Sequence, residues 1–107
     1  MTVPPEDREK RIIVRVDPEI GDLVPGFLEN RNRDVELLRN ALAQGDYETV
    51  QITGHSMKGS GRAYGFDAIT DIGRNIEEAA KNKDSEEVER WIGALKEYLG
   101  RVEVVYE

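Results

Sequence analysis

The sequence predicts an all-α protein, an antiparallel up-down four-helix bundle with a short extra helix ahead of it. Four stretches of about 15–20 residues carry apolar residues three and four positions apart, which is the spacing of one helix face. Short polar turns separate these stretches, and residues that cap helices stand at their starts. Helices joined by such short turns pack antiparallel to their neighbours, so the four apolar faces should enclose one core.

The chain of 107 residues fits a single domain and is long enough to bury a core. Its formal charge of −7 argues against binding to nucleic acid or to an anionic membrane, because Lys and Arg dominate both interactions. No apolar run approaches the roughly 20 residues of a membrane span, and the polar start has no signal-peptide pattern, so we expect a cytoplasmic protein. With no cysteine and one histidine, disulfides, thiol chemistry and a zinc site are not expected.

The two ends of the chain differ from its helical middle. Residues 1–10 are charged and rich in proline, so we expect a flexible tail ahead of a single domain at 11–107. The bundle should span about 18–100, and the flanking segments 11–16 and 101–106 are strand-like. Both segments lie at one pole of an up-down bundle, where they either pair as a two-stranded β-ribbon or stay extended coil. A ribbon must pack on the bundle or on another subunit, which leaves a monomer and a homodimer through the chain ends as alternatives.

The first helical segments follow directly after the strand-like start. Asp17 and Pro18 are typical of a helix start, a capping residue followed by proline at the first helical position. Pro25 should break this short helix and open a longer one, which Gly45 ends. The apolar residues of the two helices are Ile20, Leu23 and Val24, then Leu28, Val35, Leu38 and Leu42.

Three further long helices have similar boundaries. Asp46 should cap the second long helix, which runs to about residue 63, and Gly65 separates it from the third. Asp84 and Glu87 form a capping-box pattern at the start of the fourth helix, and Gly100 ends it. The apolar stripes of the third and fourth helices are Ile69, Ile72, Ile76 and Ala80, then Val88, Trp91, Ile92, Leu95 and Leu99.

The second long helix carries His55, the only histidine of the chain. At about 100° per residue, the positions close to His55 are mostly polar, whereas the opposite face is apolar or small. The imidazole should therefore face the solvent, on a surface that a partner protein can reach. The face of His55 holds Gln51, Ile52, Lys58, Gly59 and Arg62, and the opposite face holds Val50, Thr53, Gly54, Met57, Gly61 and Tyr64.

Three glycines lie in this helix, although each costs about 1 kcal/mol relative to alanine. Gly54 and Gly61 lie beside the core, where they permit a close approach of two helices. Gly59 lies on the outer face, where clearance for a docking protein explains it better than packing does. An exposed imidazole with Lys58 three residues on and this open position four residues on suits an acceptor of a phosphoryl group from a large protein.

These residues resemble the histidine-containing phosphotransfer (HPt) domain of multistep two-component signalling. The resemblance runs from about Glu19 to Leu99, and the family fold is the same four-helix bundle. Small departures are Gly54 and Met57, and the strand-like ends lie outside the usual bundle. The residues that carry the resemblance are His55-Ser56-Met57-Lys58-Gly59, then Gly65, Ile69, Ile72, Ile76 and Glu77.

The resemblance implies a role for each matched residue. His55 is the phosphoacceptor, which attacks through Nε2, and Lys58 neutralises the charge of the phosphate. Glu77 orients the imidazole by accepting a hydrogen bond from Nδ1, although a surface carboxylate on an acidic helix is the plainer alternative. Gly59 gives the partner room to approach, and Gln51, Ile52 and Arg62 complete the expected contact surface.

The implied function is that of a phosphorelay intermediate, or phosphocarrier. It receives a phosphoryl group from a sensor histidine kinase or a receiver-domain aspartate and passes it to a response regulator. No cofactor is expected on this chain, because the partner receiver supplies an acidic pocket and Mg²⁺. We expect no ATP-dependent kinase activity, because no glycine lies in a nucleotide-binding loop between strand and helix. The alternative is a helical interaction module that binds a receiver or kinase domain without being phosphorylated.

Overall fold

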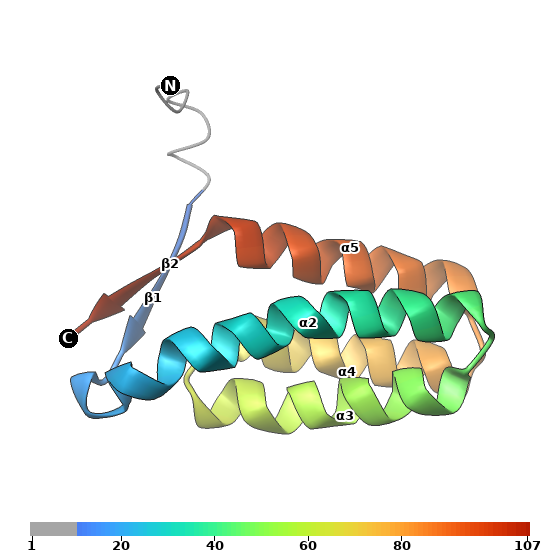
Figure 1. The fold of residues 1–107 in the computed structure, drawn as a ribbon, viewed down its shortest axis with the longest axis horizontal. Coiled ribbons are helices and arrows are strands. Elements are labelled where there is room, and N and C mark those ends of the chain that lie inside the picture. Colours follow the sequence, from blue (N-terminus) through green and yellow to red (C-terminus); the bar gives the residue numbers. More distant parts are fainter. Residues whose placement is uncertain (1–10) are drawn as a thin grey trace.

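The computed structural model describes residues 11–107, and the tail predicted at 1–10 lies outside them. Its four long helices run antiparallel to their neighbours in the sequence, which confirms the predicted up-down bundle (Figure 1). The elements in chain order are β1 (Ile12–Val16), the 3₁₀ helix η1 (Pro18–Leu23), α2 (Val24–Ala43), α3 (Tyr47–Ala63), α4 (Asp67–Lys81), α5 (Ser85–Arg101) and β2 (Val102–Tyr106).

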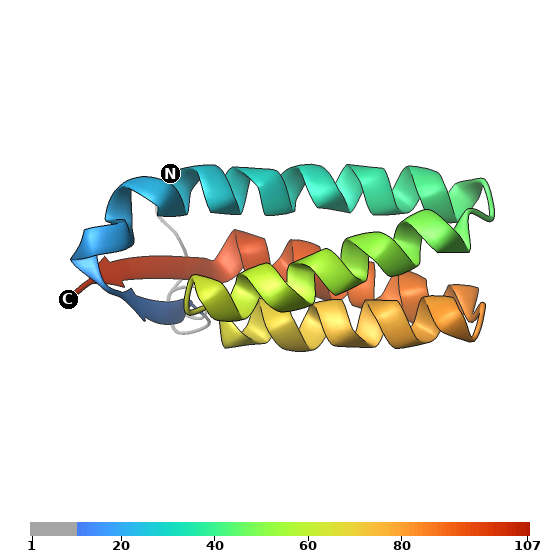
Figure 2. The same ribbon diagram turned by 90° about the horizontal axis from the view of Figure 1, so that it is seen from below.

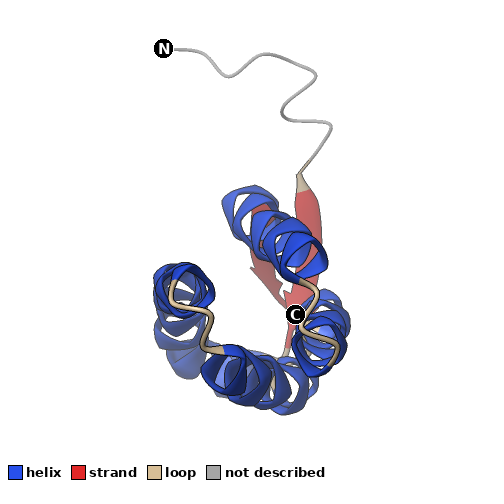
Figure 3. Cartoon of the chain, turned by 90° about the vertical axis from the view of Figure 1, so that its right-hand side faces the viewer, coloured by secondary structure: helices blue, strands red, loops and turns tan. Residues whose placement is uncertain are grey.

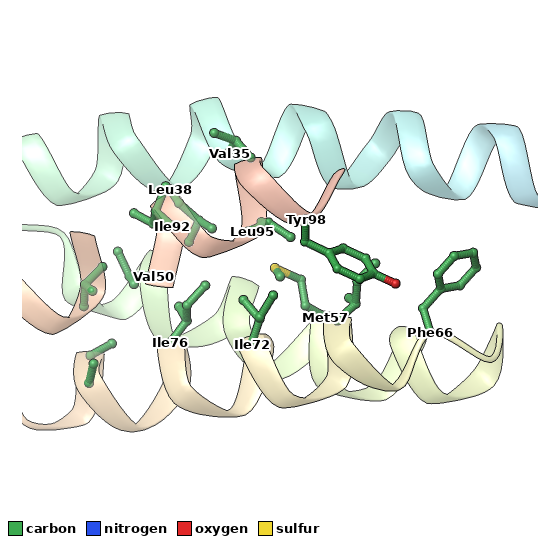
Figure 4. Close-up of a cluster of buried hydrophobic side chains, with 14 of the residues drawn as sticks. Val35, Leu38, Val50, Met57, Phe66, Ile72, Ile76, Ile92, Leu95 and Tyr98 are labelled. Atoms are coloured by element: carbon green, nitrogen blue, oxygen red, sulfur yellow. The ribbon is translucent and has the colours of Figure 1, made fainter. Parts of the chain in front are cut away.

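The four long helices surround a common apolar core. Helix α2 packs against α3 and α5, and α4 packs against the same two helices, so the four form a closed ring when seen end on (Figure 3). Burying side chains of this size stabilises the fold by about 1.5–3 kcal/mol each. Within residues 11–107, no helix is both long enough and apolar enough to cross a membrane. Fully buried side chains from all four helices meet in Figure 4, among them Leu38, Met57, Ile76, Ile92 and Leu95.

Aspartates cap three of the helical elements, as predicted. The capping box at the start of α5 is only half formed: Asp84 accepts a hydrogen bond from the backbone N–H of Glu87 at 3.2 Å. The Glu87 carboxylate does not return the bond, because it accepts from the side chains of Arg90 and Trp91 instead, both at 3.2 Å. At the starts of η1 and α3, Asp17 accepts from the N–H of Glu19 and Asp46 from that of Thr49.

The structure confirms that a short helix precedes a longer one that Pro25 opens, and it places their boundary between Leu23 and Val24 rather than at Pro25. The 3₁₀ helix passes directly into α2, which begins at Val24, and the Val24 N–H donates to the carbonyl of Gly21. Pro25 lies in the first turn of α2, where a backbone N–H has no partner within the helix, so proline removes no hydrogen bond there. The predicted stops at Gly45 and Gly65 are confirmed, since both adopt the left-handed conformation, with φ of +68° and +86°.

The chain ends pair as a two-stranded ribbon, which confirms the ribbon rather than coil. The strands are parallel, with Ile12 opposite Val102 and Val16 opposite Tyr106. If the chain ran straight from β1 into α2, β1 would run toward the bundle. Because β2 runs away from the bundle at the same pole, the two strands would then be antiparallel. Helix η1 reverses the chain between them, so both arrows point the same way (Figures 1 and 2). The ribbon packs on its own domain: Val16 belongs to the buried core cluster, and the Tyr106 ring lies against Gly21 of η1.

Candidate functional site

His55 lies near the middle of α3 and its side chain is 67% exposed. This exposure agrees with the helix face predicted from the sequence, so the ring is open to a partner protein. The opposite face of α3 lies in the core, apart from Tyr64, which is half-buried at the C-cap. Its buried residues are Val50, Thr53, Gly54, Met57 and Gly61.

Helices α3 and α4 approach so closely that side chains would not fit between their backbones. A Cβ atom on Gly54 would lie 2.8 Å from the backbone nitrogen of Glu77, and one on Gly61 would come within 2.6 Å of the α4 backbone. Both distances are shorter than any real Cβ contact, which confirms the predicted close approach. From the other side, a Cβ on Gly73 of α4 would lie 2.6 Å from the backbone nitrogen of Lys58. The helix that carries His55 is therefore held directly against the one that carries Glu77.

Glu77 lies beneath the imidazole and bridges it to a lysine. Its Oε2 atom is 2.8 Å from Nδ1 of His55, and its Oε1 atom accepts a hydrogen bond from Nζ of Lys58 at 3.0 Å. The Glu77 side chain is only 8% exposed, so the alternative of a solvated surface carboxylate is wrong. A buried carboxylate is tolerated when both oxygens have partners, as they do here. The Lys58 ammonium is the main reason that the pKa of Glu77 lies below its ordinary value, and the hydrogen bond with His55 adds to the effect against the opposing influence of burial.

This contact determines which imidazole nitrogen carries the hydrogen. The lowered pKa keeps Glu77 ionised at neutral pH, and an ionised carboxylate can only accept hydrogen bonds. Nδ1 of His55 must therefore carry the hydrogen, which leaves the lone pair of a neutral ring on Nε2. Because the ring is largely exposed, the structure combines a fixed tautomer with access from the solvent.

The other residues predicted to contact a partner surround the ring on α3. Ile52 is 61% exposed, and Gln51 is half-buried. A Cβ added at Gly59 would meet no atom within 4 Å, so this position is open space in the free protein. Arg62 is exposed and forms no ion pair with any residue of the described range 11–107.

A hollow of about 330 Å³ lies beside this surface and includes a residue that the sequence did not predict. Its lining consists of Lys58, Gly59 and Arg62 from α3 and Arg74 from α4. Arg74 lies three residues before Glu77, and this helical spacing was the signal that could have placed it on the same side of α4.

The comparisons with known proteins identify the family. The Hpt domain model matches residues 22–104, which is most of the chain. The chain belongs to the Hpt domain family. The match confirms the resemblance inferred from the motif around His55. No curated protein and no solved structure matches the chain significantly.

Membership defines the general activity and the kinds of partner. Hpt domains carry out histidine phosphotransfer in two-component signalling, and they interact with receiver domains and histidine kinases. They carry no cofactor, and within residues 11–107 no group of three or more His, Cys, Asp or Glu side chains is arranged to hold a metal ion.

Proposed function

We propose that this chain is a phosphorelay intermediate that carries a phosphoryl group on Nε2 of His55. The group arrives from a kinase or from a receiver-domain aspartate and leaves to the aspartate of a response regulator. One observation carries the proposal: an exposed imidazole has its Nδ1 held by a buried, ionised carboxylate 2.8 Å away. That arrangement leaves Nε2 as a nucleophile directed away from the bundle.

The transfer from an aspartyl phosphate balances with the groups present. The Nε2 lone pair forms a bond to phosphorus while the bond from phosphorus to the aspartate oxygen breaks, and the carboxylate leaves with that electron pair. The ring becomes positively charged as the new bond forms, and the hydrogen on Nδ1 carries part of that charge. Glu77 lies at hydrogen-bond distance from this hydrogen and stabilises the charge. The reverse sequence returns the group to the next aspartate.

Lys58 can neutralise the incoming phosphoryl group. Its side chain is 36% exposed, and its ammonium is bound to the same carboxylate that holds the ring. Phosphoryl transfer depends mainly on positioning and charge neutralisation, so a cation held beside the nucleophile is the contribution expected of this chain. The partner receiver provides the acidic pocket with its Mg²⁺. The chain acts as a phosphocarrier, without nucleotide chemistry of its own.

Phosphoramidate tests the nucleophile without any partner. This small donor transfers its phosphoryl group to an imidazole nitrogen and releases ammonia, so the product is seen as an acid-labile increase in mass. The wild-type chain should gain one phosphoryl group, and His55→Gln should gain none while keeping its helical circular dichroism and melting temperature. Acid-labile labelling of the His55→Gln chain would overturn the assignment.

A screen of the purified chain against receiver domains from the same genome then tests the relay. We expect the phosphorylated chain to transfer its group to at least one receiver, which gains an acyl phosphate on its aspartate as the label on His55 disappears. A chain that labels with phosphoramidate and binds receivers, yet never exchanges phosphate with them, would instead be the interaction module.

A further inference from the structure

We propose that the hollow beside His55 receives a carboxylate side chain of the docking partner, and that Arg62 and Arg74 thereby select partners with an acidic rim around their phosphorylated aspartate. The inference rests on the proposed function, since it concerns the same docking surface. It adds a specificity site made of two arginines, one of which lies on a helix that does not carry the phosphoacceptor.

The charge of the hollow is opposite to that of the molecule. The chain has a formal charge of −7, yet three cations and no acidic residue are found among the described residues that line this space. Arg62 has no ion-pair partner within residues 11–107, and Arg74 is 49% exposed, with a 3.1 Å contact to Asp71 one helical turn away. Exposed pairs of this kind contribute little, so both guanidinium groups remain available to an incoming anion.

The shape of the hollow admits a partner side chain from the solvent. Gly59 contributes no side-chain atoms, which keeps the hollow open toward the solvent. Beneath it, the backbones of α3 and α4 touch at Gly73 and Lys58, so the space cannot continue into the core. A space of about 330 Å³ has room for a whole acidic side chain with water around it, and the guanidinium groups that line it carry the forked donors that bind a carboxylate.

The position of the hollow favours a partner side chain over the phosphoryl group itself. His55 is not among the residues that line it, and a phosphoryl group on Nε2 stays attached to that ring. Lys58 lies between the His55 ring and the hollow. Its ammonium is bound to Glu77 beneath the ring, and its side chain forms one wall of the hollow. A carboxylate in the hollow would therefore lie beside the transferring group, where it can hold the partner in position.

Three glutamine variants test the inference with the receiver that accepts phosphate fastest in the screen. Arg62→Gln and Arg74→Gln each remove one cation of the hollow. Arg90→Gln is the matched control, because Arg90 is also an exposed arginine with a contact to a carboxylate three residues earlier, but it lies on α5. The measurement is the transfer rate as a function of receiver concentration, repeated at low and high salt.

Each hollow variant should raise the half-saturating receiver concentration about threefold to tenfold at low salt and leave the maximal rate within about twofold. High salt should reduce the difference from wild type, because it screens the exposed charges. Arg90→Gln should behave as wild type throughout. A half-saturating concentration that is equal in all four chains would overturn the inference.

Two further measurements separate this inference from its competitors. Phosphoramidate has no partner carboxylate, so Arg62→Gln and Arg74→Gln should be labelled at the wild-type rate within about twofold; an equally large loss there would mean that the hollow serves the phosphoryl group. Binding of the receiver to the His55→Gln chain measures docking without transfer. The same binding is then measured with Arg74→Gln added to the His55→Gln chain. If the second substitution weakens binding, but the wild-type chain never transfers phosphate, the hollow is a docking site and the proposed function is wrong.

Discussion

Replacing Gly59 with alanine should stabilise the free protein and slow phosphate transfer. Gly59 lies inside α3, and an added Cβ would meet no atom within 4 Å. Alanine is favoured over glycine in a helix interior by about 0.5–1 kcal/mol, and nothing in the structure opposes this gain. For a domain of this size, the melting temperature should rise by about 2–4 °C. The same methyl group would protrude into the space through which a partner must approach.

The loss of transfer can be estimated from the cost of a forced contact. Inserting a methyl group into a well-packed interface costs about 1–3 kcal/mol, which corresponds to a loss of about fivefold to more than a hundredfold in docking affinity. Urea unfolding measures the stability, and a rapid-mixing time course with the receiver measures the transfer. Labelling by phosphoramidate should stay close to wild type, because the small donor needs no protein contact at this position.

Gly93→Ala is the matched control for Gly59→Ala. Gly93 lies inside α5, is exposed and likewise has no atom within 4 Å of an added Cβ. Both variants should gain the same stability, but only Gly59→Ala should slow transfer from the receiver. A Gly59→Ala chain that is stabilised and transfers at the wild-type rate would refute the clearance argument. Loss of stability in Gly59→Ala alone would show that the position is not open.

Three other outcomes follow from the contacts of α3 and α4. Gly73→Ala should lower the free energy of unfolding in urea by about 1–3 kcal/mol, because its Cβ would lie 2.6 Å from the Lys58 backbone nitrogen; unchanged stability would contradict that distance. In the folded protein, Glu77 has a pKa below its ordinary 4.5. Its ionised form therefore stabilises the fold above that pH, and this contribution to the free energy of unfolding is lost as the pH falls toward the pKa of the folded state. The stability difference between wild type and Glu77→Gln should therefore shrink from about pH 6 to about pH 3, and a constant difference would argue against the ionic network. Lys58→Ala should raise the pKa of Glu77 in an NMR titration and slow transfer without abolishing it, whereas an unchanged pKa would mean that the lysine contact is absent in solution.

The features that the sequence predicts well depend on residues close together in the chain. The exposure of His55 follows from a period of about 100° per residue, and the caps at Asp46 and Asp84 follow from hydrogen bonds to residues three positions on. Pro25 opens α2 as expected, because the first turn of a helix tolerates proline, but the exact boundary with η1 depends on backbone hydrogen bonds that the sequence does not reveal. The parallel direction of the ribbon depends on how η1 turns the chain, which is a matter of tertiary packing.

One feature of the site could not be predicted from a single sequence, namely the distance between the axes of α3 and α4. Gly54 and Gly73 each remove a Cβ that would clash with the opposite backbone, so α3 and α4 lie close enough for Glu77 to reach His55 and Lys58 together. The spacing of 22 residues between histidine and glutamate is informative only once that approach is known. Widening the gap between the helices by even a methyl group would lengthen the hydrogen bond to Nδ1, free the tautomer and expose the carboxylate to water. The glycines between the helices therefore act on the nucleophile without touching it, and their effect on labelling by phosphoramidate should exceed that of Gly59, which faces the partner alone.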